Sequence, residues 1–159
     1  MARVVITDAG PLIAFAGIDA LCVLQSLFSE VRIAESVQRE CLRKPGPDSR
    51  RIETAVEEGW LLIFTPGAVT EPLSPSLGAG ESDSIRYALE SPDESLLIVD
   101  NRLARRYALK LGINIVGTVR ILDLAEQRGL IRSADQRIAE MVAFGYRISV
   151  ELLQQIRSR

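Results

Sequence analysis

The stretch that decides the fold is Leu96-Leu97-Ile98-Val99-Asp100, in which four apolar residues run directly into a carboxylate. A continuous apolar run of this length is typical of a strand buried on both faces of a parallel sheet. The segment 101–111 that follows is rich in arginine and has helical spacing, so we expect Asp100 at the carboxyl end of a strand. Open α/β sheets bind their ligands at this end of their strands.

The start of the chain repeats this arrangement. Val4-Val5-Ile6-Thr7 ends in Asp8, which comes directly before the turn sequence Ala9-Gly10-Pro11. A single Asp after a strand is equally a turn former or a helix cap. Two carboxylates at one edge of one sheet repel each other, however, so the pair persists where divalent cations neutralise it or where one member is protonated.

Strand and helix patterns alternate over the first 128 residues, which predicts an α/β protein with a parallel sheet, right-handed crossovers and helices on both faces. We expect a single domain over residues 1–159, with a helical extension at about 130–159, and one long irregular loop over 65–80. The expected strands cover 3–7, 31–33, 60–64, 96–99 and 114–116; the expected helices cover 12–16, 19–28, 35–43, 48–58, 81–90, 101–111, 119–128 and 133–144, and a last helix begins at Ser149.

Composition narrows the possible chemistry. The 159 residues are 47% hydrophobic, which is enough for one domain with a sizeable core, and the formal net charge is −2. Residues 71–100 carry seven acids against one base, whereas residues 102–137 carry eight bases against three acids. An acidic cluster beside a basic face is expected where metal ions and phosphates share a site, and a solvated surface produces it as well.

The chain contains no histidine. This excludes Ser-His-Asp and Cys-His nucleophile pairs, histidine acid/base catalysis and histidine-ligated zinc. The two cysteines, Cys22 and Cys41, have no zinc-site spacing and are expected as reduced thiols in or near the core. No leader sequence and no apolar run of membrane-spanning length is present, so we expect a cytoplasmic protein without a membrane partner.

Two further acids can face the same cleft. Glu40 lies late in the helix expected over 35–43, and Glu81 lies in the first turn of the helix expected over 81–90. Helical spacing turns Asp83 away from Glu81, which makes it the weaker candidate. Oxygen ligands without His or Cys indicate Mg²⁺ or Mn²⁺. Thr118, after the last strand, is a candidate to hold a water or phosphate oxygen and equally a helix cap.

Five motifs carry a resemblance to a known family, and they occur in the order that the family shows. They are Asp8-Ala-Gly-Pro-Leu12, Val37-Gln-Arg-Glu40, Gly80-Glu81-Ser-Asp-Ser-Ile85, Leu97-Ile-Val-Asp100-Asn-Arg-Leu-Ala-Arg105 and Val116-Gly-Thr118. With them the chain resembles the PIN-domain nucleases, and more closely a branch related to the VapC-type toxins of bacterial and archaeal toxin–antitoxin pairs. The tail Gly145-Tyr-Arg-Ile-Ser149 is similar to that branch too, so the resemblance covers nearly the whole chain.

The resemblance implies a three-layer α/β/α fold, a parallel sheet of about five strands in the order 3-2-1-4-5, and metal-dependent cleavage of single-stranded RNA. In this order the first and fourth strands are neighbours, so Asp8 and Asp100 would meet at the switch point. Asp8, Glu40, Glu81 and Asp100 fall on the acidic positions of the family. Most relatives have Asp where Glu81 stands, and Asn101 occupies a position that is often acidic in the nearer branch.

The resulting hypothesis is an Mg²⁺- or Mn²⁺-dependent endoribonuclease in which these four acids, with Asp83 as a further candidate, hold one or two ions. The ions would activate a water for in-line hydrolysis of the phosphodiester bond. We expect substrate phosphates to be held by Arg102, Arg105, Arg106 and Thr118. The alternative for the arginines is an ordinary solvated helix face, and Arg105 alternatively pairs with a site acid.

Two alternative functions and two candidate partners follow from the same sequence. A PIN-like module that has lost catalysis would serve as an RNA-binding or regulatory scaffold, for which Asn101 is the hint. A phosphoacceptor or nucleotide-binding domain fits worse, because there is no second acid after the first strand and no glycine-rich phosphate loop. A protein antitoxin is a candidate partner. A homodimer through the helical tail, equally explained by packing within one chain, would use Ile138, Met141, Val142, Leu152, Leu153 and Ile156.

Overall fold

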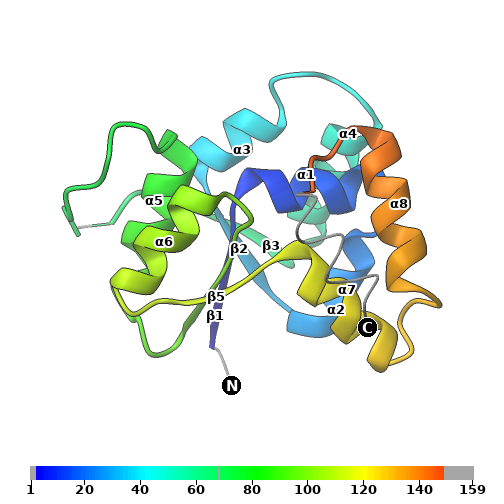
Figure 1. Ribbon diagram of the computed structural model, residues 1–159. Coiled ribbons are helices and arrows are strands. Elements are labelled where there is room, and N and C mark those ends of the chain that lie inside the picture. The colour runs from blue at the N-terminus through cyan, green and yellow to red at the C-terminus, as the bar shows by residue number, and fades with distance from the viewer. Residues whose placement is uncertain (1–2, 68, 149–159) are drawn as a thin grey trace.

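The computed structural model describes residues 3–67 and 69–148, and within these ranges five short parallel strands form one sheet (Figure 1). The strands lie in the order β3-β2-β1-β4-β5, which confirms the predicted topology. They are β1 (Val4–Thr7), β2 (Val31–Ala34), β3 (Leu61–Phe64), β4 (Ser95–Ile98) and β5 (Asn114–Val116).

Helices cover both faces of this sheet, as the alternating pattern predicted. In Figure 1, α5 and α6 lie on one side of the sheet, and α1, α2, α4 and α7 lie on the other, with α8 packed against α1 and α7. The helices are α1 (Ala9–Gly17), α2 (Leu21–Phe28), α3 (Glu35–Cys41), α4 (Pro47–Glu58), α5 (Ala79–Ala88), α6 (Arg102–Lys110), α7 (Thr118–Gln127) and α8 (Ala134–Phe144).

The register between β1 and β4 brings their two acids to one edge. Thr7 pairs with Ile98, so both strands end at the same level. The backbone N–H of Asp8 then donates to the carbonyl of Ile98 at 3.0 Å, which extends the pairing by one residue. Asp100 follows two residues after Ile98, so both carboxylates leave the sheet at its carboxyl end, at the switch point.

Two helices begin earlier than their patterns predicted. α1 begins at Ala9, directly after the strand, where the sequence favoured a turn before a helix at residue 12. Pro11 is compatible with this first turn because the N–H groups there have no partner within the helix. α5 begins at Ala79, two residues before Glu81. In consequence Asp8 is the N-cap residue of α1, and Glu81 is the third residue of α5.

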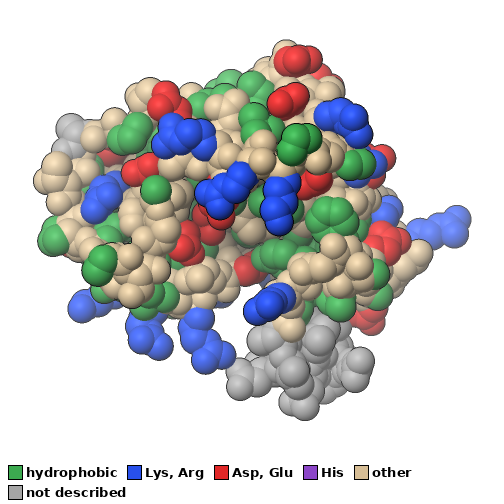
Figure 2. All heavy atoms as spheres, turned by 90° about the horizontal axis from the view of Figure 1, so that it is seen from above, with side chains coloured by type: hydrophobic (Ala, Val, Ile, Leu, Met, Phe, Trp, Pro, Cys, Tyr) green, Lys and Arg blue, Asp and Glu red, His purple; other side chains and the backbone are tan. Residues whose placement is uncertain are grey.

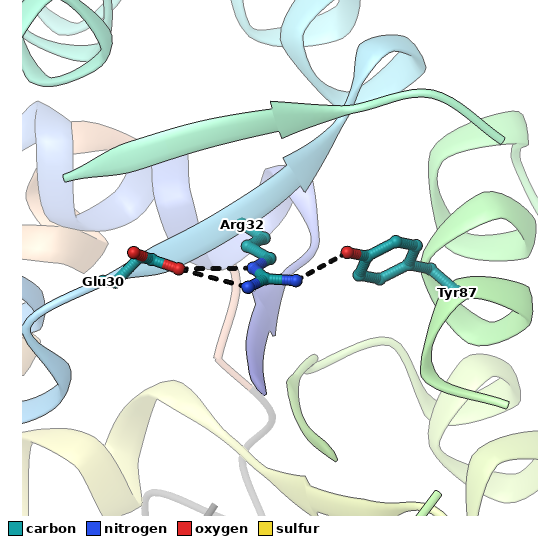
Figure 3. Close-up of polar contacts among 3 residues, drawn as sticks. All are labelled: Glu30, Arg32 and Tyr87. Atoms are coloured by element: carbon teal, nitrogen blue, oxygen red, sulfur yellow. Dashed lines mark hydrogen bonds and ion pairs between the residues drawn. The ribbon is translucent and has the colours of Figure 1, made fainter. Parts of the chain in front are cut away.

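Arg32 on β2 links the sheet to α5 (Figure 3). Its guanidinium donates to the Tyr87 hydroxyl at 2.7 Å and contacts the Glu30 carboxylate at 3.3 Å. The Tyr87 ring stacks on Phe64 with 3.7 Å between the ring centroids. Arg32 therefore holds α5 on the sheet from the side away from the acids.

The core follows the apolar strands. Leu97, Ile98 and Val99 are buried, as expected for a central strand, while Leu96 is half-buried. Cys41 is buried, but Cys22 is exposed on α2, so the expectation of two core thiols is wrong for Cys22. The exposed thiol lies on the outer side of a short helix, a placement that the apolar spacing of α2 did not reveal.

Helix α8 begins where the sequence predicted and packs within the same chain. The Ser133 hydroxyl accepts from the N–H of Gln136 at 3.1 Å, which confirms the predicted N-cap. Ile138 and Met141 are buried within the same chain, and Val142 is exposed. The helix expected from Ser149, and the residues predicted there for a dimer surface, lie outside the described residues.

Among the described residues, no single helix is both long and apolar enough to cross a membrane. α1 and α2 taken together reach the required length and composition, but the chain bends by 118° between them.

Truncating the buried strand should destabilise the fold strongly. We expect Leu97→Ala, at a side chain that is 1% exposed, to lower the free energy of unfolding by about 2–5 kcal/mol, because it removes apolar contacts and leaves a cavity. Leu109→Ala is the matched control, since this leucine is 62% exposed and its loss should cost less than about 0.5 kcal/mol. Urea unfolding measures both, and equal losses would contradict the assignment of β4 to the core.

Candidate active site

A cleft of about 360 Å³ opens at the carboxyl edge of the sheet. All four predicted acids line it: Asp8, Glu40, Glu81 and Asp100. Figure 2 looks onto this side of the molecule from above and shows acidic side chains lying between basic ones. The other lining residues are Gly10, Pro11, Gly78, Asn101, Tyr146 and Arg147.

Asp8 is the most buried of these acids, with 7% of its surface exposed. Its Oδ1 atom is buried without a hydrogen-bond partner, which is costly for a carboxylate oxygen. Burial raises the pKa of Asp8 to about 7, against the lowering effect of a hydrogen bond from the Ala9 backbone. Burial is the largest cause of this rise, and the charges of the other three acids also contribute to it. The site therefore disfavours the ionised form of Asp8 unless a positive charge compensates it.

Asp100 is held by three donors from outside its own strand. The backbone N–H of Thr118 donates to Oδ1 at 2.9 Å, and the hydroxyls of Thr118 and Tyr146 both donate to Oδ2. Burial raises the pKa of the Tyr146 hydroxyl above its usual value, so this group stays protonated and remains a donor. These bonds fix the orientation of the carboxylate, and they place the predicted Thr118 next to an acid of the site.

Glu81 is tied to the start of its helix. Its Oε1 atom accepts from the backbone N–H of Gly78 at 3.0 Å, as in a capping box. Glu40 is exposed near the end of α3. Thus Glu81 is anchored by one oxygen, while no hydrogen bond in the described part of the chain holds the Glu40 carboxylate in place.

Gly80 allows the acids from three elements to approach one another. A Cβ atom at this position would lie 2.9 Å from the Val37 side chain, 3.6 Å from Glu40 Oε2 and 3.7 Å from Asp8 Oδ1. Two carboxylate oxygens therefore lie within 4 Å of a single point next to the backbone of α5. A larger residue at Gly80 would push α5 away from α3 and widen the site.

Not all predicted site residues line the cleft: Asp83, Arg102, Arg105 and Arg106 lie outside its lining. The Asp83 carboxylate accepts from the Ser36 hydroxyl at 2.6 Å, which links α5 to α3, and Asp83 does not line the cleft. Arg105 donates to the Val99 carbonyl at 2.9 Å and braces the end of β4. Arg102 and Arg106 are exposed on α6 and are also absent from the lining.

Asn101, Tyr146 and Arg147 also line the cleft, although none of them was among the predicted ligands or phosphate contacts. Asn101 is the N-cap of α6, and its side-chain oxygen accepts from the Ala104 N–H at 3.0 Å. Tyr146 and Arg147 reach the cleft from the segment after α8. No periodic pattern connects residue 146 with residue 100, and the family-like tail sequence was the one signal that pointed to this segment.

The donor set fits a hard divalent cation. All four acids offer oxygen ligands, and the unpartnered, buried oxygen of Asp8 is the kind of atom that a cation satisfies. Within residues 3–67 and 69–148, no three acidic or cysteine side chains form a group that could hold an ion as they stand. Binding would therefore require side-chain rotation, for which the exposed Glu40 is free.

Comparison with known proteins agrees with this architecture. A sequence profile described as PIN domain matches residues 4–159, so this chain belongs to the PIN-domain family, whose members are generally nucleases. The solved structure of a PilT N-terminus domain protein from the hyperthermophilic archaeon Sulfolobus solfataricus P2 is similar in fold, with a TM-score of 0.55. The two chains are 17% identical over 77% of this chain and 93% of the archaeal one. No match is found among curated protein sequences.

Asp8→Asn should stabilise the cation-free protein at high pH. The pKa of Asp8 rises from 3.8 to about 7 on folding, so the folded chain holds this proton more tightly than the unfolded chain does. The stability that the protonated form contributes is complete below pH 3.8 and is lost as the pH rises through 7. The free energy of unfolding lost in this way is on the order of 4 kcal/mol. An asparagine side chain does not ionise, so the variant does not lose it.

Urea unfolding in a chelating buffer measures the effect. The gain in free energy of unfolding from Asp8→Asn should grow as the pH is raised from about 5 to about 8. A gain that does not change with pH, or a loss at pH 8, would contradict the placement of Asp8.

Proposed function

We propose that this protein is a divalent-metal-dependent endoribonuclease that hydrolyses phosphodiester bonds of single-stranded RNA. The observation that carries the proposal is the buried, unpartnered oxygen of Asp8 in a cleft lined by three more acids. A cluster of this kind suits Mg²⁺ or Mn²⁺, and membership of the PIN-domain family makes nuclease chemistry the expected use.

The acids have different parts in this proposal. Asp8, Glu40, Glu81 and Asp100 would hold the cation, and a bound cation supplies a water of lowered pKa and positive charge near the reacting phosphate. Asp100 offers a carboxylate already oriented by its three donors. Glu40 is exposed and can turn toward Asp8. Asp83 could join as a ligand only by giving up its bond to Ser36.

Basic groups near the cleft would hold the RNA. Arg147 is the one cationic side chain in the cleft lining of the described chain, so it is placed to contact the phosphate nearest the acids. Arg102 and Arg106, both exposed on α6, would hold flanking phosphates. Arg105 would act indirectly, through the Val99 carbonyl. Thr118 is 1% exposed and its hydroxyl donates to Asp100, so it would act on the phosphate through that carboxylate.

The wider role rests on the resemblance to the VapC-related branch. By this resemblance, the protein would be a cytoplasmic toxin that acts as a homodimer and has a protein antitoxin as its partner. The alternative is an RNA-binding or regulatory scaffold without catalysis, to which the residue at position 101 first pointed. In the structure Asn101 caps α6, a role that does not depend on a negative charge, so its presence leaves the four acids in place.

Removal of the metal should abolish activity. We expect Asp8→Asn, and separately treatment with EDTA, to reduce cleavage of a single-stranded RNA at least a hundredfold, because the cluster then loses its buried ligand or its cation. Gel assays with added Mn²⁺ measure the rate. Asp93→Asn is the control, since this exposed acid lies before β4, at the opposite edge of the sheet.

Two results would decide between the enzyme and the scaffold. Full cleavage after chelation would exclude the metal-dependent mechanism. Calorimetric titration with Mn²⁺ that shows no binding to the wild-type protein, together with retained RNA binding, would favour the scaffold.

Arg147 should contribute to RNA binding more than a distant arginine does. We expect Arg147→Ala to raise the KM for RNA roughly fivefold, equivalent to about 1 kcal/mol, by removing one phosphate contact at an exposed site. The salt dependence of binding should become shallower by about 0.7 in the log–log slope. Arg128→Ala, at the far end of α7, is the control and should change neither quantity. Equal effects of the two variants would contradict the assignment of Arg147.

A further inference from the structure

The segment after α8 is turned into the cleft by a glycine. Gly145 has a φ of +116°, in the left-handed region that favours glycine. The N–H groups of Gly145 and Tyr146 both donate to the Met141 carbonyl, at 3.2 and 2.9 Å. This closes the helix end and reverses the chain, so that Tyr146 points back toward the sheet edge where the acids lie.

Two aromatic side chains join this segment to α1. The Phe144 ring lies against Gly17, where an added Cβ would come within 2.4 Å of the ring. The Tyr146 hydroxyl lies 3.7 Å from the position that a Cβ on Gly10 would take. α1 is the helix that begins directly after Asp8, so the segment is positioned relative to the most buried acid of the site.

The Tyr146 hydroxyl completes the set of donors around Asp100. Thr118 approaches this carboxylate from α7, and Tyr146 approaches it from the segment after α8. The two hydroxyls share the Oδ2 atom, so rotation of the carboxylate breaks both bonds. Without the Tyr146 hydroxyl, the Asp100 carboxylate would keep hydrogen bonds from Thr118 only.

We propose that Tyr146 is a positioning residue that sets the Asp100 carboxylate for cation binding, so that the segment from Gly145 to Tyr146 forms part of the active site. The inference rests on the proposed function and deepens it. Tyr146 does not touch the reacting phosphate in this arrangement; it acts through Asp100. Hydrogen bonds to a metal ligand from outside the coordination sphere orient that ligand, and losing one typically weakens metal binding 10- to 100-fold.

The test is Tyr146→Phe, which keeps the ring against Gly10 and removes only the hydroxyl. We expect the Kd for Mn²⁺, measured by calorimetry without RNA, to rise about tenfold. In cleavage assays at fixed Mn²⁺, kcat should fall while the KM for RNA stays within about twofold, because the RNA contacts are unchanged. In an Asp100→Asn background the same substitution should add no further loss of Mn²⁺ affinity, because the hydroxyl acts through the Asp100 carboxylate.

Tyr87→Phe is the matched control. Its hydroxyl also takes part in a hydrogen bond between distant elements, with Arg32 (Figure 3), but Tyr87 does not line the cleft. It should leave the Kd for Mn²⁺ unchanged, and thermal unfolding of both variants checks that each is folded.

The outcomes separate the two proposals. Unchanged Mn²⁺ affinity in Tyr146→Phe would overturn the positioning role while the proposed function stands. Tighter binding would overturn it as well, because it would show that the hydroxyl competes with the cation for Asp100. A wild-type protein that binds no Mn²⁺ would overturn the proposed function and, with it, this inference.

Discussion

The electrostatic cost of burying Asp8 beside three other acids is the constraint on which the rest of the site depends. One of its oxygens has no partner, and its pKa is raised to about 7, mainly by burial. Hydrogen bonds and close packing hold the neighbouring residues near Asp8. Asp100 receives three hydrogen bonds, Glu81 is bonded to Gly78, and Gly80 has no side chain that would keep α5 away. Such an arrangement is disfavoured without a compensating cation, and this is the physical basis of the metal site that we propose.

The parallel sheet also reduces this cost. A crossover between parallel strands leaves the sheet at its carboxyl edge, and a helix can begin there. The N-terminus of such a helix carries partial positive charge. Asp8 precedes α1, Glu81 is in the first turn of α5, Asn101 caps α6, and Thr118 begins α7. Four helix N-termini therefore lie near the acids, and their partial positive charge favours negative charge at this edge.

Much of this could be predicted from local patterns. The apolar runs ending in Asp8 and Asp100 were sufficient to place both acids at strand ends, and the parallel register of β1 and β4 then brought them to one edge. The patterns were less informative where a side chain's direction mattered. Asp83 and Glu81 are two residues apart on α5, yet one bonds to Ser36 and the other lines the cleft. Arg105 and Arg106 are neighbours in the arginine-rich α6, yet Arg106 is exposed and Arg105 turns inward to the Val99 carbonyl.

By itself the sequence determined the elements, the parallel sheet and the presence of strand-end carboxylates, because hydrophobic periodicity and turn residues act over a few neighbouring positions. The tertiary structure alone decided that Tyr146 meets Asp100, that Gly80 lies between Glu40 and Asp8, and that Arg147 reaches the cleft. Tyr146 is 46 positions from Asp100 in the sequence, and Gly80 is 40 positions from Glu40 and 72 from Asp8. These contacts depend on how α8 packs on α1 and how α5 approaches α3, and no local pattern encodes the packing of one helix against another.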